Sequence, residues 1–391
     1  MSDPARPARE IRALTGARAL PPLFLVLYHY HEGHGYQHLP WFDIFVAKGY
    51  LWVEFFFILS GFVLTYVYLS RWESLFTLKG YGLFLRNRLA RLYPVHLAMI
   101  VVLAIMLVVL RALAHAGGYV SVFDLPVYHP DMSARALVFN LLLIQAWHVM
   151  GHLSWNGVAW FISVEFALCL AFPIFLFAAR GSVARALLLL ALGFITLRNL
   201  ALTSGHGLDI TFDLGLVRGF ADFAIGVALA MLHRHADSYA QRLPELAFTA
   251  IQLLVFGIFF YAMYHTGWAH NPMDVWIAAA MTLIVASLCF DRGAIARLFT
   301  LKPLRRLGEW SYAIYMGQTA LLMLLRLCEQ RLYPQDLTAH YRLVHILEPA
   351  LLVPSCVLWG YALYRLVEKP ANRWLRGPAA PALPQSPERA T

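Results

Sequence analysis

The chain has 391 residues, of which 60% are hydrophobic and 14% are charged, and its formal net charge is +9. Soluble domains average roughly 45–50% apolar and about 25% charged residues, so this composition excludes an ordinary soluble protein and indicates a membrane protein. In a membrane protein, excess Lys and Arg normally collect in cytoplasmic loops, so the positive charge gives no reason to expect a nucleic-acid partner.

Long apolar segments recur along the chain from about Leu14 to Leu366. A helix that crosses a bilayer needs about 17–25 largely apolar residues. One apolar stretch, Ala136 to Trp147, is shorter than this and is predicted to be an interfacial or re-entrant helix that does not cross the membrane. We therefore expect an all-α polytopic helical bundle with about ten transmembrane helices, near residues 14–33, 49–69, 92–114, 157–179, 184–202, 214–233, 246–266, 274–290, 310–327 and 345–367.

The basic residues predict the orientation of this bundle. With ten crossings, most Lys and Arg residues fall in alternate loops, and those assigned to the opposite loops are Lys48, Arg135, Arg331 and Arg342. The positive-inside rule then places both termini in the cytoplasm. A further crossing at 136–147 would invert every later loop and remove most of the asymmetry.

The bundle is predicted to form one domain, residues 1–376, followed by a cytoplasmic tail, residues 377–391. The tail is rich in Pro and Ala and has no hydrophobic period, so we expect it to be disordered.

The first predicted span carries Arg18 and His29. They are eleven residues apart, close to three helical turns, so in a continuous helix they would share a face about 16 Å apart. Pro21 and Pro22 lie between them and are expected to kink the helix, because each lacks a backbone donor. A histidine can take a proton from a hydroxyl group near neutral pH, so His29 is a candidate general base, and a structural histidine is the alternative.

A carboxylate inside a predicted span is notable, because an unpaired charge there would be costly. Glu165 is in the fourth span, and we expect Arg18 to be its partner. It is a candidate functional residue, and an ion pair that only fixes helix register is the alternative. Glu54 is in the second span near Ser60 and Gly61, whose small side chains predict close helix packing.

The third span is preceded by Arg88 and Arg91, which are three residues apart and therefore neighbours on one helical face. Guanidinium groups can bind phosphate through two parallel hydrogen bonds, so this pair is a candidate site for the phosphates of a nucleotide-containing donor such as coenzyme A. A cytoplasmic anchor that binds lipid headgroups is the alternative interpretation.

The last two spans add further polar groups at their cytoplasmic ends. Tyr312 and Tyr315 are three residues apart and are predicted to line a cavity, with an interfacial aromatic belt as the alternative. Glu368 lies where the last span leaves the membrane, and it could pair with Arg88 or Arg91 or be an ordinary exposed carboxylate.

No metal site and no disulfide are expected. The spacing of the residues that most resemble ligands fits no zinc pattern, and the cysteines are far apart. These residues are His31, Glu32, His34 and His38 in one outer loop, and Cys169, Cys289, Cys328 and Cys356 elsewhere.

The order and spacing of these clusters resemble acyltransferase family 3, a family of membrane O-acyltransferases, along nearly the whole chain. Each matching segment is weak alone, but six in the family's order form a specific pattern. The segments are Leu14 to Leu20 with His29, Glu54 to Phe62, Arg88 to Pro94, Trp160 to Glu165, Ser311 to Tyr315, and Val367 to Pro370.

The resemblance implies a donor, acyl-CoA and most often acetyl-CoA, and it assigns roles by position. Gln318 stands where the family commonly has a histidine, and a glutamine can hydrogen-bond but cannot shuttle a proton at neutral pH. Catalysis is assigned to His29 and Glu165. Donor binding is assigned to Arg88, Arg91, Arg18, Tyr312 and Glu368.

Acceptors in the family are usually hydroxyls of surface polysaccharides, peptidoglycan or lipid-linked glycan precursors, so the resemblance implies a bacterial inner-membrane enzyme surrounded by lipid. Our hypothesis is that His29 deprotonates the acceptor hydroxyl or carries the acyl group itself. A transporter or flippase of a lipid-linked glycan and a structural or sensory membrane protein are the alternatives. The acceptor and the choice between acetyl and longer acyl groups stay open at this point.

Overall fold

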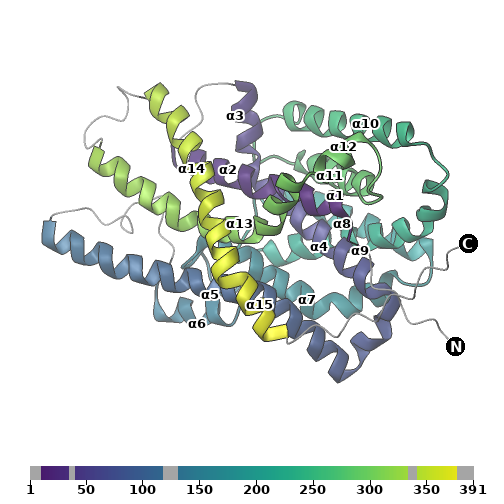
Figure 1. The fold of residues 1–391 in the computed structure, drawn as a ribbon, viewed down its shortest axis with the longest axis horizontal. Coiled ribbons are helices and arrows are strands. Elements are labelled where there is room, and N and C mark those ends of the chain that lie inside the picture. The colour runs from purple at the N-terminus through teal and green to yellow at the C-terminus, as the bar shows by residue number, and fades with distance from the viewer. Residues whose placement is uncertain (1–9, 35–39, 118–130, 333–340, 377–391) are drawn as a thin grey trace, which may run out of the picture.

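The computed structural model describes residues 10–34, 40–117, 131–332 and 341–376 (Figure 1). Every named element within these ranges is helical, which confirms the predicted all-α class. In chain order the elements are α1 (Arg12–Ala17), α2 (Leu20–His34), α3 (Pro40–Ala47), η1 (Gly49–Leu51), α4 (Trp52–Tyr68), η2 (Leu69–Phe76), α5 (Leu78–Gly117), α6 (Ala134–Leu141), η5 (Gly157–Ala159), α7 (Trp160–Ala179), α8 (Val183–Thr203), α9 (Gly215–Ala240), α10 (Glu245–His265), α11 (Asp274–Leu288), α12 (Ala294–Phe299), α13 (Lys302–Leu332), α14 (Tyr341–Leu363), η6 (Tyr364–Glu368) and α15 (Lys369–Arg376).

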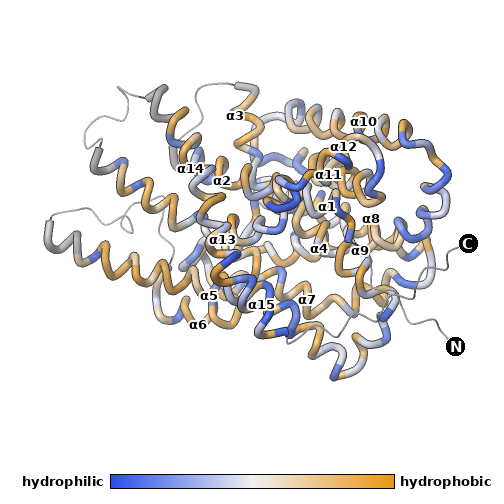
Figure 2. Tube along the Cα trace, in the orientation of Figure 1, coloured by the Kyte–Doolittle hydropathy of each residue, from blue (hydrophilic) through white to orange (hydrophobic). Residues whose placement is uncertain are grey.

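Helical segments in the described part of the chain are apolar enough to cross a membrane, so the prediction of a polytopic membrane protein is confirmed (Figure 2). Three of the ten predicted spans are not among the segments that qualify as membrane-crossing. They correspond to α2 and α11, which have 15 residues each, and to α13. The count of ten therefore stays a prediction, and the tail 377–391 lies outside the described residues. The segments that qualify by length and composition are the seven at Gly49–Phe76, Leu78–Ala112, Gly157–Ala179, Val183–Thr203, Gly215–Ala240, Glu245–His265 and Ile346–Arg376.

The apolar stretch at 136–147 does not cross the bundle. Only α6 is helical there, and eight residues of helix span about 12 Å, less than half of a bilayer core. The backbone of Asp131, before α6, pairs with Leu153 and Trp155, after it, at N–O distances of 3.1 and 3.2 Å. The segment therefore enters and leaves at the same place, as a re-entrant element does.

The first predicted span is not one helix. α1 ends at Ala17, and α2 begins at Leu20 after a turn that contains Arg18. Pro21 and Pro22 lie in the first turn of α2, where backbone N–H groups have no intrahelical acceptor, so they start a new helix instead of kinking an old one. The expectation that Arg18 and His29 share a face of one helix was wrong.

The helices α4 and α9 pack closely because glycines lie where they touch. A Cβ atom on Gly61 would lie 2.3 Å from the carbonyl oxygen of Phe223, and one on Gly226 would lie 2.0 Å from that of Ile58. The close packing predicted from Ser60 and Gly61 is therefore confirmed at Gly61.

The same helix pair contains a buried ion pair that the sequence analysis missed. Arg218 on α9 donates from Nε to both carboxylate oxygens of Glu54, at 3.0 and 2.9 Å, and both side chains are fully buried. Its remaining nitrogens donate to the carbonyls of Ile210 and Tyr50. A charged residue inside the predicted span 214–233 was the available signal.

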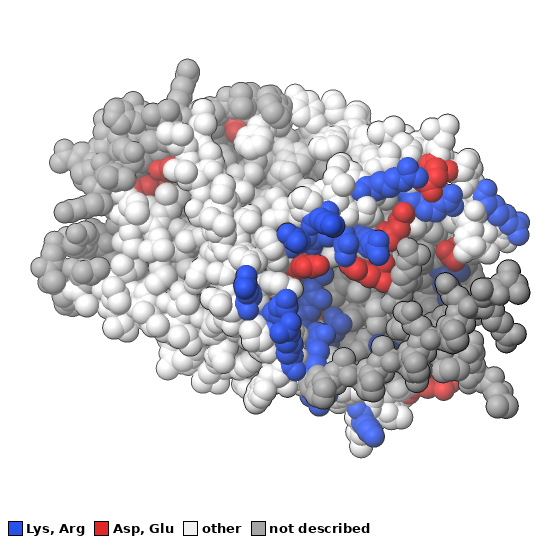
Figure 3. All heavy atoms as spheres, in the orientation of Figure 1, with Lys and Arg blue, Asp and Glu red and all other residues white. Residues whose placement is uncertain are grey.

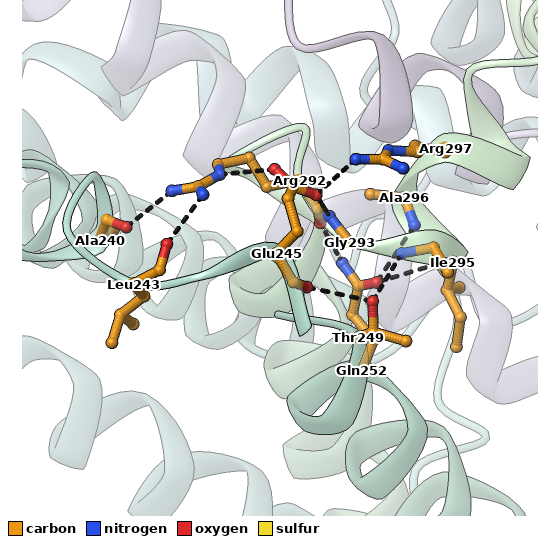
Figure 4. Close-up of polar contacts among 11 residues, drawn as sticks. Ala240, Leu243, Glu245, Thr249, Gln252, Arg292, Gly293, Ile295, Ala296 and Arg297 are labelled. Carbon is orange, nitrogen blue, oxygen red and sulfur yellow. Dashed lines mark hydrogen bonds and ion pairs between the residues drawn. The ribbon is translucent and has the colours of Figure 1, made fainter. Parts of the chain in front are cut away.

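A polar cluster fixes the short helix α12 against α10 (Figure 4). Glu245 accepts from Arg292 and Arg297, each at 2.9 Å, and Gln252 accepts from the backbone N–H groups of Ile295 and Ala296. Because these bonds join α10 to the first turn of α12, they set the position of α12 in the bundle.

The helix α12 in turn helps to seat α1. A Cβ atom on Gly16 of α1 would lie 1.9 Å from the carbonyl oxygen of Phe299, and one on Gly308 of α13 would lie 1.7 Å from that of Thr15. α1 is thus held between α12 and α13 with no room for a side chain at either contact. This packing positions Arg18, the residue that follows α1.

Positive charge gathers on one half of the face in Figure 3, over α15 and around α12. Figure 2 shows hydrophilic residues in α15, whereas most of α5 and α7 is hydrophobic. The basic end of the molecule is therefore also the end where the helices become polar, as expected for a surface that leaves the membrane.

Candidate active site

An inner cavity of about 90 Å³ lies among α4, α5, α7 and α13, beside the turn that precedes α2. Apolar residues, among them Phe56, Leu59 and Phe161, form most of its wall. Its polar lining residues are Arg18, Ser60, Arg88, Arg91, Glu165, Ser311, Tyr312 and Tyr315. The structure therefore brings five of the predicted site residues, from four separate segments of sequence, to one cavity.

A wider cavity of about 760 Å³, which we call the mouth, adjoins the inner cavity. The two share Arg18 and Arg91 as lining residues. The mouth is strongly polar, and its lining includes Glu368, another of the predicted site residues. Arg18 and Arg91 therefore stand between a charged vestibule and a mostly apolar chamber.

The three arginines of the inner cavity are not neutralised by direct ion pairs. Within the described residues, no carboxylate oxygen lies within 4 Å of a side-chain nitrogen of Arg18, Arg88 or Arg91. The Nε atom of Arg88 is buried without a hydrogen-bond partner. Guanidinium groups in this condition favour an anionic or strongly polar ligand.

The expected ion pair between Arg18 and Glu165 is absent from the described residues. Glu165 instead accepts a hydrogen bond from Ser60, and its second oxygen is buried without a partner. The predicted pairing was wrong because Arg18 and Glu165 both line the inner cavity without forming a direct contact across it. Glu368 likewise forms no ion pair with Arg88 or Arg91, although it lines the mouth beside Arg91.

Tyr312 and Tyr315 line the inner cavity, as their spacing predicted. Their hydroxyl groups donate to the backbone carbonyls of Leu92 and Val158, respectively, so both rings are fixed in place. One turn further along α13, Gln318 is fully buried, its amide nitrogen donates to the carbonyl of Tyr315, and its Oε1 atom has no partner.

His29 lies apart from this group. It is nine residues into α2, about 14 Å along the helix from Leu20, and it lines neither the inner cavity nor the mouth. Its Nδ1 atom is 2.7 Å from the carbonyl oxygen of Leu25. A carbonyl oxygen can only accept, so Nδ1 carries the proton, and in the neutral ring Nε2 carries the lone pair that a general base needs.

An acidic and aromatic cluster that the sequence analysis did not foresee lies beside His29. The hydroxyl of the adjacent Tyr28 donates to Asp209 at 3.1 Å, and Asp209 is 3.5 Å from Nδ1 of His270. The ring of His270 stacks on Tyr50, whose hydroxyl donates to Asp274 at 2.7 Å. These residues come from segments that are distant in sequence, so no local pattern predicted their meeting.

Among the described residues, no group of three or more His, Cys, Asp or Glu side chains is placed to hold a metal ion. Four basic residues of the mouth, Arg86, Lys369, Arg373 and Arg376, entered the sequence analysis only as orientation signals. Their spacing carried no further signal, because α5 and α15 are almost 300 residues apart and meet only in the folded chain.

Comparison with known proteins identifies the family of the chain. A family model described as an acyltransferase domain matches residues 11–365. The chain is similar to Acyltransferase MdmB of Streptomyces mycarofaciens, with 28% identity over 68% of this chain and 67% of that protein. It is also similar to the putative peptidoglycan O-acetyltransferase YrhL of Bacillus subtilis, with 24% identity over 81% of this chain and 49% of that protein.

A third relative is the peptidoglycan O-acetyltransferase OatA of Listeria monocytogenes, with 24% identity over 80% of this chain and 50% of that protein. The chain spans about half the length of these two peptidoglycan O-acetyltransferases. No solved structure matches the chain. The family model covers His29 and every residue that lines the inner cavity, and the chain therefore belongs to acyltransferase family 3, as its sequence predicted.

Proposed function

We propose that the chain transfers an acyl group from acyl-CoA on the cytoplasmic side to a hydroxyl group of a glycan on the opposite side of the membrane. The observation that carries this proposal is the pair of adjoining cavities, a wide charged mouth and a narrow apolar chamber that share Arg18 and Arg91. Acyl-CoA is divided in the same way, because a phosphate-bearing nucleotide ends in a thin uncharged arm that carries the thioester.

In this proposal the donor enters by its arm. Its phosphates stay in the mouth, where Arg91 faces them, and its arm passes Arg18 into the inner cavity. Arg88 lines only the inner cavity, so it meets the polar groups of the arm that passes through. Tyr312 shapes the wall, and the apolar side chains exclude water that would hydrolyse the thioester.

The acyl group must travel beyond the inner cavity to reach His29. Along α13, the mouth residue Glu309 is followed by Tyr312 and Tyr315 of the inner cavity and then by Gln318, so an arm that extends past Tyr315 next meets Gln318. The unpartnered Oε1 of Gln318 is an acceptor for an amide N–H of that arm. A glutamine suffices for this role, because positioning requires no proton transfer.

At His29 the chemistry needs one base and one activated acyl group. The acceptor hydroxyl oxygen attacks the thioester carbonyl carbon, and its proton passes to Nε2 of His29. The carbon–sulfur bond then breaks, and the departing thiolate takes the proton to leave as the free thiol of coenzyme A. Glu165 faces the arginines of the inner cavity and supports this reaction through charge.

The acceptor is proposed to be a glycan because two of the relatives are named for O-acetylation of peptidoglycan. The cluster beside His29 suits such a ligand, since Asp209 can accept hydrogen bonds from sugar hydroxyls and the exposed ring of His270 offers a face for a sugar to pack on. A free or lipid-linked glycan at the outer face of a bacterial inner membrane, with both chain termini in the cytoplasm, is consistent with this arrangement.

The proposal is tested by release of free thiol from acetyl-CoA by the purified chain in detergent, with and without peptidoglycan fragments. Release that requires both protein and glycan, and that falls at least about a hundredfold in His29→Gln, is expected for loss of a general base. No release with any glycan acceptor, together with glycan flux across proteoliposomes, would instead indicate the transporter alternative.

A further inference from the structure

The mouth contains basic side chains that the proposed function has not used. Arg86 comes from the first third of α5, and Lys369, Arg373 and Arg376 come from α15, the helix that follows α14 and η6. α15 packs directly on α5, so residues from the two ends of the chain form one rim. Lys and Arg side chains dominate this part of the surface in Figure 3.

Two of these arginines hold the rim together through neutral groups. A terminal nitrogen of Arg86 donates to the carbonyl oxygen of Arg376 at 3.3 Å, and one of Arg376 donates to the carbonyl oxygen of Asn87 at 3.4 Å. Within the described residues, neither arginine has a carboxylate within 4 Å, and the same holds for Lys369 and Arg373. The rim therefore carries positive charge that is oriented but not neutralised.

A second observation points to a ligand in the same place. Glu368 is only 5% exposed, lines the mouth, and has one carboxylate oxygen without a hydrogen-bond partner. It ends η6, a π-helical turn between α14 and α15, and such turns are frequent at functional sites. A buried carboxylate oxygen among cations is suited to accept a hydrogen bond from a neutral donor, such as a ribose hydroxyl or a base amine.

We propose that the mouth is a ribonucleotide site in which the rim residues Arg86, Lys369, Arg373 and Arg376 bind the phosphate groups of the donor and Glu368 accepts from its nucleoside. This inference rests on the proposed function, because it names where the nucleotide of acyl-CoA is held. It also gives the arginines different roles. The rim residues bind the phosphates, whereas Arg88 lines only the inner cavity and does not reach them.

The test compares a donor that has the nucleotide with one that lacks it. The double variant Arg373→Gln/Arg376→Gln should bind acetyl-CoA at least about tenfold more weakly, because it loses two charge-assisted contacts. Its turnover of S-acetyl-pantetheine, which has no nucleotide and no phosphate, should be unchanged. Arg365→Gln is the matched control, because Arg365 is exposed in the same segment and lines neither cavity.

Three outcomes would overturn the inference. Equal acetyl-CoA affinity in the double variant and in wild type would show that Arg373 and Arg376 of the rim do not bind the donor. An equal loss in Arg365→Gln would show that general surface charge is responsible. A loss of affinity that appears in phosphatidylglycerol-containing nanodiscs, but not in pure phosphatidylcholine nanodiscs, would assign the rim to lipid headgroups.

The same experiment separates this inference from the proposed function. If wild type binds acetyl-CoA and Arg91→Gln weakens that binding while the double variant does not, the donor assignment stands and the ribonucleotide rim fails. If wild type binds neither acetyl-CoA nor S-acetyl-pantetheine, the proposed function fails and the rim assignment fails with it.

Discussion

At the scale of single residues, Arg218 gives a prediction about stability. It is fully buried, and it is paired with Glu54 near a second buried carboxylate, Asp222. Arg218→Met would leave both carboxylates buried without a cation, so the free energy of unfolding should fall by about 3–5 kcal/mol. Thermal unfolding in detergent, followed by size-exclusion chromatography, measures this loss.

Arg297→Met is the matched control for that prediction. Arg297 pairs with Glu245 at the surface, its side chain is 68% exposed, and exposed ion pairs contribute about 0–1 kcal/mol (Figure 4). Unfolding midpoints that fall equally in the two variants would show that burial of Arg218 is not what makes it important.

Glu165 gives a kinetic prediction at the same scale. Its carboxylate faces three arginines across the inner cavity, and the donor is an anion. Glu165→Gln removes a negative charge, so donor binding should not weaken, while kcat should fall by roughly a hundredfold if the residue acts in the transition state. A rise in the KM for acetyl-CoA with unchanged kcat would contradict the catalytic assignment.

Much of the candidate site could be predicted from sequence because polar residues inside apolar spans are rare and stand out, as Arg18, Glu165 and Tyr312 did. Their pairing could not be predicted. Whether Arg18 contacts Glu165 depends on distances across a cavity, and those distances are set by how α1 sits on α12 and α13. For His29 the sequence predicted a proximity that the structure does not have. The spacing placed His29 on the same helical face as Arg18, but the turn between α1 and α2 puts the two residues on different helices.

At the scale of elements, the contact between α4 and α9 depends on the absence of side chains. In Gly226→Ala the new Cβ atom would lie 2.0 Å from the backbone carbonyl of Ile58, so the helices must move apart. Overpacking of this kind typically costs about 1–3 kcal/mol, and we expect a lower unfolding midpoint.

Gly257→Ala tests whether this effect comes from the contact or from the substitution itself. Gly257 lies within α10, and a Cβ atom there would meet nothing within 4 Å. Because alanine favours helix over glycine by about 1 kcal/mol, this variant should be as stable as wild type or more stable. A midpoint in Gly226→Ala as high as in Gly257→Ala would contradict the close packing of α4 and α9.

The sequence predicted where most helices lie but not where they end. Hydropathy detects only the part of a helix that suits hydrocarbon, so the predicted span 92–114 missed the polar beginning of α5 at Leu78. For the same reason the span 345–367 ended inside η6, just before Glu368 and α15, which line the mouth. The surface that we propose for donor binding was therefore the part least visible in the sequence.

At the scale of the whole molecule, the predicted orientation in the membrane can be tested by labelling introduced cysteines from one side. In a Cys328→Ser background, cysteines at Arg135 and Gly151, which flank the re-entrant element, should react with a membrane-impermeant maleimide added outside the cell. Cysteines at Glu73 and Arg242 should react only after the membrane is opened. All four positions are exposed. Opposite reactivity at 135 and 151 would mean that the segment between them crosses the membrane.

The central claim is that one chain moves an acyl group between the two sides of a membrane. The most direct measurement uses sealed proteoliposomes, with acetyl-CoA labelled in its acetyl group on the side of the mouth and peptidoglycan fragments only on the side of His29. The account predicts label on the fragments, dependent on wild-type protein and lost in His29→Gln. Free labelled acetate with no labelled glycan, or equal labelling by His29→Gln, would contradict it.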